Sequence, residues 1–83
     1  MNLEKYKWKS RILLVITPNF KDKSYQKVKK IYQIKIKQFH KRHVKLICKT
    51  NKNEPFSVNL IGFDGKIKKV MNDLNYRVVF QII

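Results

Sequence analysis

The feature of this sequence that most constrains its fold is an uninterrupted apolar run near the N-terminus. Ile12-Leu13-Leu14-Val15-Ile16 follows Arg11 and ends at Thr17-Pro18-Asn19. A half-exposed strand alternates apolar and polar residues, whereas a short β-branched run without alternation is typical of a strand covered on both faces. We therefore predict a central strand over Arg11 to Ile16.

A helix is predicted next, from about Ser24 to Lys41, with Asp22 or Ser24 as its N-cap. Its apolar residues recur every three or four positions and define one face: Tyr25, Val28, Tyr32, Ile36 and Phe39. The opposite face carries Lys27, Lys30, Lys37 and Lys41, and Ile34 is out of place among these lysines.

The second half of the chain alternates strands and turns. Val44, Leu46 and Cys48 alternate with Lys45, Ile47 and Lys49 in a second strand, and a loop over 51–55 leads to a third strand over 56–61. Asp64-Gly65 predicts a hairpin turn into a fourth strand over 66–71. Asn72 or Asp73 is the predicted cap of a last helix in which Leu74, Val78 and Ile82 share a face.

This order is β-α-β followed by β-β-α, which predicts one α/β domain over 1–83. The first unit should be a parallel pair with a right-handed crossover, and the second should begin with an antiparallel hairpin. The expected architecture is a four-stranded mixed sheet with two helices. A split ferredoxin-like arrangement is the main alternative, although it would end in another strand.

The segment Glu54 to Ile67 resembles the proline–strand–turn–strand segment of thioredoxins, and the element order is that of the minimal thioredoxin core. The resemblance implies that Pro55 is the counterpart of the cis-proline of that fold. Tyr6-Lys7-Trp8-Lys9-Ser10-Arg11 and Leu60-Ile61-Gly62-Phe63-Asp64-Gly65 resemble two motifs of the thioredoxin-like domain of unknown function 4174 family. That family has a longer connection between the second and third strands, and its function is unknown, so the resemblance implies a fold and little more.

Redox catalysis of the thioredoxin type is not expected. It needs a thiolate just after the first strand, at a helix N-terminus that lowers the thiol pKa. This chain has Thr17-Pro18-Asn19-Phe20 there, and Cys48 is its single cysteine. We predict that the protein is not an enzyme and that Cys48 is a structural or incidental thiol; an enzyme would require Cys48 to be reactive.

The charge balance predicts a polyanionic partner, since 20 Lys and Arg face 5 Asp and Glu, a net charge of +15. The leading hypothesis is a non-catalytic adaptor that docks an acidic protein complex in a larger assembly. The predicted binding residues form a basic face: Lys27, Lys30, Lys37, Lys41, Arg42, Lys66 and Lys68. A solvated lysine surface is the alternative, and docking to an anionic membrane is another.

RNA binding, for example in an organellar ribosome or another ribonucleoprotein, is the nearest rival. Tyr6, Trp8 and Arg11 alternate with lysines on what we predict to be an extended segment, and interleaved aromatic and cationic residues suit a nucleic-acid groove. The competing interpretation packs Tyr6 and Trp8 under the edge of the sheet and pairs Arg11 locally.

No metal site, cofactor or small-molecule substrate is expected. His40 and His43 are three residues apart, but zinc requires three or four ligands and no acid joins them. The chain has no apolar stretch long enough for a membrane span and no secretory signal in its first ten residues. A lone cysteine suits a reducing, intracellular compartment. Abundant Lys, Ile and Asn with no Ala are typical of AT-rich codons, which favours a plastid stroma or another organelle matrix, or an AT-rich bacterium.

Overall fold

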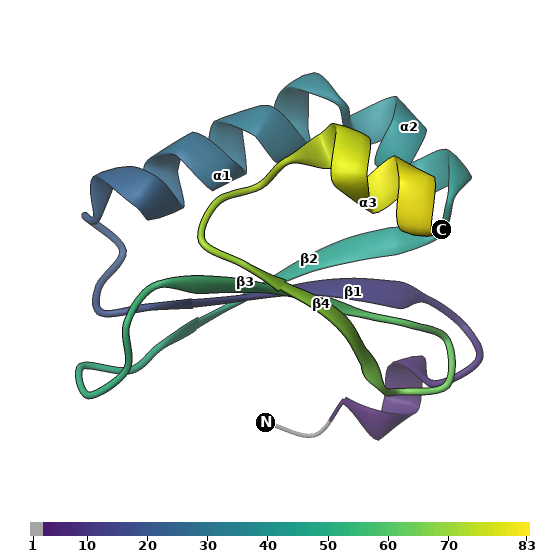
Figure 1. Cartoon of the computed structure of the whole chain (residues 1–83), viewed down its shortest axis with the longest axis horizontal. Helices are drawn as coiled ribbons and strands as arrows, with labels where there is room; N and C mark the ends of the chain where they lie inside the picture. The colour runs from purple at the N-terminus through teal and green to yellow at the C-terminus, as the bar shows by residue number, and fades with distance from the viewer. Residues whose placement is uncertain (1–2) are drawn as a thin grey trace.

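The computed structural model describes residues 3–83 as one sheet with helices packed on it (Figure 1). A short 3-10 helix η1 (Glu4–Tyr6) precedes the sheet. The other elements, in chain order, are β1 (Arg11–Thr17), α1 (Lys23–Ile34), α2 (Ile36–Lys41), β2 (Val44–Thr50), β3 (Ser57–Ile61), β4 (Ile67–Met71) and α3 (Tyr76–Ile82). The predicted α/β class and all four predicted strands are confirmed.

The sheet has the strand order β2-β1-β3-β4. β1 pairs in parallel with β2 and antiparallel with β3, and β3 pairs antiparallel with β4. The apolar run therefore forms an inner strand of a four-stranded mixed sheet, as predicted. The arrangement is consistent with a small thioredoxin-like fold.

One face of the sheet carries the three helices and the main core (Figure 1). Tyr25, Val28, Tyr32 and Phe39 of α1 and α2 are buried against strand residues such as Leu13. Asp22 caps α1, because its carboxylate accepts hydrogen bonds from the backbone N–H groups of Ser24 and Tyr25. The predicted apolar helix face and one of its two candidate caps are thus confirmed.

The prediction of two helices was wrong. Lys35 leaves the helical conformation, so the predicted helix over 24–41 is divided into α1 and α2. The apolar spacing is unchanged across the break because a single residue departs from the helix. A periodic pattern therefore cannot reveal this division.

The last helix also begins later than predicted. Asn75 is its N-cap, accepting a hydrogen bond from the N–H of Val78, and neither Asn72 nor Asp73 has this role. Leu74 is buried before the helix begins, Val79 is fully buried within it, and Ile82 is 44 % exposed. The predicted shared face of Leu74, Val78 and Ile82 is wrong because the segment up to Asn75 is not helical.

Two further expectations are corrected by the backbone. Residues 3–83 contain no cis peptide bond, so the bond before Pro55 is trans and its predicted resemblance to a cis-proline does not hold. Most of the segment from Tyr6 to Arg11 is not extended: residues 6–10 form the end of η1 and a turn in which Trp8 has a φ of +65°, and only Arg11, the first residue of β1, lies in a strand. The turn is held by the Trp8 N–H, which donates to the carbonyl oxygen of Phe63 at 2.7 Å.

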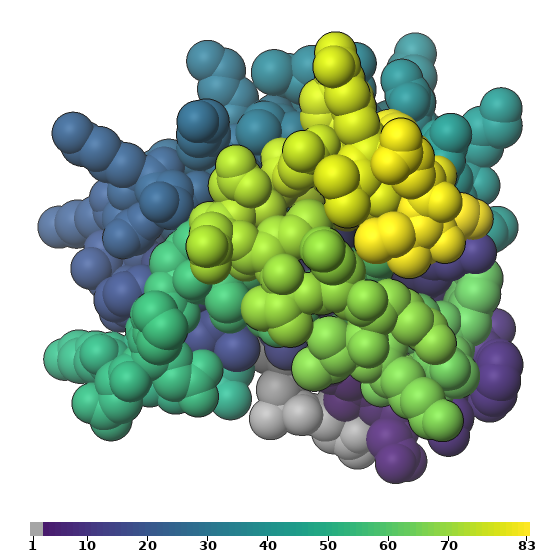
Figure 2. Space-filling model, in the orientation of Figure 1, coloured from purple at the N-terminus to yellow at the C-terminus, as the bar shows by residue number. Residues whose placement is uncertain are grey.

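Both outer strands carry lysines, which oppose pairing of a strand edge with another chain. Lys68 and Lys69 of β4 and Lys45 and Lys49 of β2 are all exposed. Figure 2 shows the β4 side of the molecule, where the segment that leads from the hairpin to α3 lies across the front.

Candidate functional site

The corner that follows β1 holds no thiol. Thr17 is fully buried, and its hydroxyl donates to the carbonyl oxygen of Asn19 at 2.8 Å. At the N-terminus of α1 the Asp22 carboxylate already accepts the N–H groups of Ser24, at 2.8 Å, and Tyr25, at 3.4 Å. The helix end that would stabilise an anionic reactant is therefore occupied by a side chain of the chain itself.

Cys48 lies far along β2, next to Val15 of β1, and packs against the core. It is half-buried, and burial raises the pKa of its thiol, although a hydrogen bond with Tyr25 and the charge of Lys29 act in the opposite direction. The thiol is therefore protonated at neutral pH, which is unfavourable for a nucleophile. Within residues 3–83, no three His, Cys, Asp or Glu side chains gather where they could hold a metal ion.

The four helical lysines of the predicted basic face are exposed and lie in the helical layer. Lys27 and Lys30 belong to α1, and Lys37 and Lys41 belong to α2. Arg42 differs from them, because it is half-buried, donates to the carbonyl oxygen of Gln38 and places its guanidinium 4.2 Å from the ring centre of Phe80. Arg42 therefore joins α2 to α3, and its guanidinium is already engaged.

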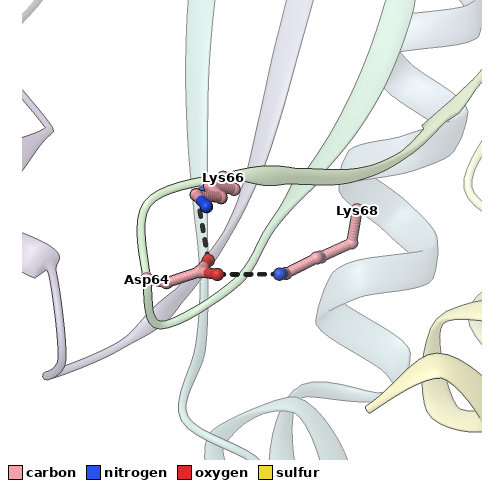
Figure 3. A network of polar contacts seen from close by, with 3 residues as sticks. All are labelled: Asp64, Lys66 and Lys68. Atoms are coloured by element: carbon pink, nitrogen blue, oxygen red, sulfur yellow. Dashed lines mark hydrogen bonds and ion pairs between the residues drawn. The ribbon is translucent and has the colours of Figure 1, made fainter.

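The two predicted basic residues of the hairpin surround an acidic side chain (Figure 3). The Nζ of Lys68 lies 2.9 Å from Oδ2 of Asp64, and the backbone N–H of Lys66 donates to Oδ1 of Asp64 at 3.0 Å. The hydrogen bond from Lys68 holds the pKa of the Asp64 carboxyl below its usual value. Gly65 completes the turn with a φ of +80°, which glycine adopts without strain. Asp64 and Gly65 therefore have the turn roles predicted for them.

The predicted basic face is not continuous. The helical lysines lie in the layer above the sheet, whereas the hairpin lies at one end of the sheet (Figure 1). The charge of Lys68 is also partly met by Asp64. Of the predicted residues, the helical lysines are the largest group in one layer of the molecule, and all four are exposed.

The predicted aromatic and basic segment does not form a single groove. Lys45 lies with its Nζ 5.3 Å from the ring centre of Tyr6. Trp8 is 71 % exposed. Arg11 donates to the carbonyl oxygen of Arg42 at 2.7 Å and lies 4.3 Å from the ring centre of Phe63. Arg11 is thus engaged within the fold, by residues that are distant in the sequence. Trp8 is not packed under the sheet: it lines a hollow together with Arg11 and Phe63, whereas Tyr6 lines a different one.

The second face of the sheet carries a surface that sequence reasoning missed. Strand register places side chains on this face in three rows, because residues paired across strands point to the same side. The first row is Lys45, Ile12, Ile61 and Ile67; the second is Ile47, Leu14, Asn59 and Val70; the third is Lys49, Ile16 and Ser57. None of these residues belongs to the core under the helices.

Residues 3–10 cover only one end of this face (Figure 1). Ile12 and Ile61 of the first row are buried beside Tyr6 and Lys7. Val70 of the second row is 56 % exposed. We call the second and third rows the open sheet face. The alternation in β2 placed Lys45, Ile47 and Lys49 on the side away from the core, but the apolar run of β1 has no alternation that would reveal the same side.

Comparison with known proteins gives one family. The family model described as "Domain of unknown function (DUF4174)" matches residues 2–54. The match includes the Tyr6–Arg11 motif and ends before the hairpin. No curated protein and no solved structure matches the chain. Separately, none of the helices within residues 3–83 is long and apolar enough to cross a membrane.

Proposed function

The chain belongs to the DUF4174 family, whose function is unknown, and we propose that it is a non-catalytic, strongly basic subunit that docks an acidic partner protein in a larger assembly. The observation that carries this proposal is the excess of exposed cationic side chains over acidic ones. With 20 basic and 5 acidic residues, the acidic side chains are too few to pair with most of the cations.

The position of the helical lysines supports an acidic protein as the partner. Lys27, Lys30, Lys37 and Lys41 are exposed and lie along one helical layer. A row of cations of this kind attracts a negatively charged surface and accelerates its association, while contributing less to the final affinity.

The absence of a thiol at the corner after β1 supports a binding role instead of redox catalysis. Asp22 engages the N-terminus of α1, and the raised pKa of Cys48 disfavours its thiolate. Neither feature suits thioredoxin-type chemistry. The compartment that we propose, on the basis of the lone cysteine, is a reducing one such as an organelle matrix.

RNA binding is the outcome that would replace this proposal. A groove for single-stranded RNA combines cations with aromatic platforms on which bases stack. Here Trp8 and Arg11 line one hollow with Phe63, whereas Tyr6 lines another and lies beside Lys45, so the three residues that the sequence offered do not form one groove.

The test is purification of the tagged protein from its native cell at moderate salt, with and without ribonuclease. We expect an acidic protein to remain bound after ribonuclease. Release of the co-purifying material by ribonuclease, or a steep salt dependence of binding to purified RNA, would establish RNA as the partner instead.

A matched pair of variants locates the contact. Lys27, Lys30, Lys37 and Lys41 are changed to Glu together, and a control variant changes Lys7, Lys9, Lys52 and Lys69 to Glu. All eight side chains are exposed, and both variants lower the net charge equally. We expect loss of the partner from the first variant and retention by the second; equal loss would mean that only the total charge matters.

A further inference from the structure

We propose that the open sheet face binds an acidic, amphipathic helix of the partner protein. This inference rests on the proposed function and adds a second contact to it: the helical lysines attract the acidic partner, and the open sheet face, on the opposite side of the sheet, accepts one helix of that partner. The docking residues are Leu14, Ile16, Ile47 and Val70, flanked by Lys45 and Lys49.

The first argument is the burial that β1 requires. Its residues from Ile12 to Ile16 are apolar on both sides of the strand, and a strand with such an unbroken apolar run is typically covered on both faces. The helices cover the side of Leu13 and Val15, whereas Leu14 and Ile16 face the other side. Residues 51–56, which join β2 to β3, form a loop with no helix to cover that side.

The second argument is the composition of the open sheet face. Leu14, Ile16 and Ile47 are half-buried and form an apolar strip across β1 and β2. The exposed Val70 of β4 lies beyond Asn59 of β3, which is buried and donates its amide N–H to the carbonyl oxygen of Leu14 at 3.1 Å. A helix laid across a sheet buries such a strip, as α1 does on the opposite face (Figure 1). Bases of RNA instead stack on aromatic rings, and none of the three rows contains one.

The third argument is charge complementarity. Lys45 and Lys49 are exposed on β2 beside the apolar strip, and none of the three rows contains an acidic residue. A helix with glutamates or aspartates beside its apolar stripe would pair with these lysines as the stripe is buried. A second copy of the chain is disfavoured, because each copy carries a net charge of +15 and presents the same lysines.

Site-specific photo-crosslinking in the native cell tests the inference. Benzoylphenylalanine is introduced in place of Val70, on the open sheet face, and in a control protein in place of Ile34, on the helical layer. Both positions are exposed, 56 % and 66 %, so the probe is tolerated at either. We expect position 70 to crosslink to an acidic segment with apolar residues at helical spacing.

The other outcomes separate this inference from the proposed function. If an acidic protein crosslinks only through position 34, or co-purifies without crosslinking to either position, the docking surface is wrong and the proposed function stands. If position 70 crosslinks to a second copy of the chain, the inference is overturned. If it crosslinks to RNA, both are overturned.

A matched pair of substitutions measures the contribution of the surface. Val70→Asp and Ile34→Asp change the charge equally, on opposite sides of the molecule. With the crosslinked segment as a synthetic peptide, we expect V70D to weaken binding by about tenfold or more and I34D to leave it unchanged. Thermal unfolding checks that each variant folds, and V70S replaces V70D if the aspartate unfolds the chain. Unchanged binding by a folded variant at position 70 would overturn the inference.

Discussion

The hydroxyl of Tyr32 donates a hydrogen bond to the carbonyl oxygen of Val44, 2.9 Å away, and so joins α1 to the first residue of β2. Both residues are buried. Tyr32→Phe leaves that carbonyl without this donor, and we expect a loss of about 1–2 kcal/mol in the free energy of unfolding. Urea denaturation measures the free energy of unfolding of both proteins, and Tyr6→Phe is the control for loss of a tyrosine hydroxyl elsewhere. Equal stability of Tyr32→Phe and the wild type would mean that the bond contributes nothing net.

Asp64 should make stability depend on acid pH. Its pKa in the folded state lies below the ordinary value of 3.8, first because of the hydrogen bond from Lys68. The stabilisation of the fold by ionised Asp64 is therefore fully present above pH 3.8, and it is lost as the pH falls through the lower pKa of the folded state. The stability difference between wild type and Asp64→Asn should shrink on acidification. A difference that is constant with pH, or a carboxyl pKa at or above 3.8 by NMR titration, would contradict this.

Gly65 should tolerate substitution only by residues that adopt a positive φ. Its φ is +80°, and a Cβ there would meet no atom closer than 3.9 Å, so the cost is conformational and not steric. We expect Gly65→Ala to destabilise the fold by about 1 kcal/mol and Gly65→Asn by less, because asparagine adopts this region more readily. Thermal unfolding compares the two, and equal losses would contradict the explanation.

Trp8 combines a positive φ of +65° with a side chain that is 71 % exposed. Such a backbone is unfavourable for a bulky residue, and so exposed a ring contributes little burial. Trp8→Asn should therefore stabilise the isolated chain by about 0.5–1 kcal/mol. Destabilisation would instead show that the ring packs more strongly against its neighbours than its exposure indicates.

Cys48 should react slowly with alkylating reagents. Burial raises its pKa, and only the thiolate reacts. We expect iodoacetamide to label Cys48 more slowly than it labels a small free thiol at the same pH, with Cys48→Ser as the blank. Labelling at the rate of the free thiol or faster would restore the hypothesis of a reactive cysteine.

Predictions from sequence succeeded where the deciding contacts are local. Asp22 caps α1 through residues two and three positions away, and the turn at Asp64-Gly65 depends on the same short range. The apolar spacing of Tyr25, Val28, Tyr32 and Phe39 likewise needs only the helical period. These features determine the elements and their order before any packing occurs.

Predictions failed where distant residues decide the conformation. The alternation of Tyr6, Trp8 and Arg11 with lysines predicts an extended segment, yet the Trp8 N–H donates to the carbonyl oxygen of Phe63 and the chain turns before Arg11. Its sequence neighbours predict that Arg42 belongs to an exposed basic face, yet its guanidinium lies over the ring of Phe80 in α3. No local pattern near either residue encodes these partners.

The candidate site shows the same difference between features set by nearby residues and features set by distant ones. The sequence by itself determined a basic chain with an inner apolar strand and no thiol at the corner after that strand. Only the tertiary structure decided that the helices all pack on one face, and that Leu14, Ile47 and Val70 from three strands share the other face with Lys45 and Lys49. Which side chains share a face is set by strand register, and register arises from pairing between segments far apart in the chain.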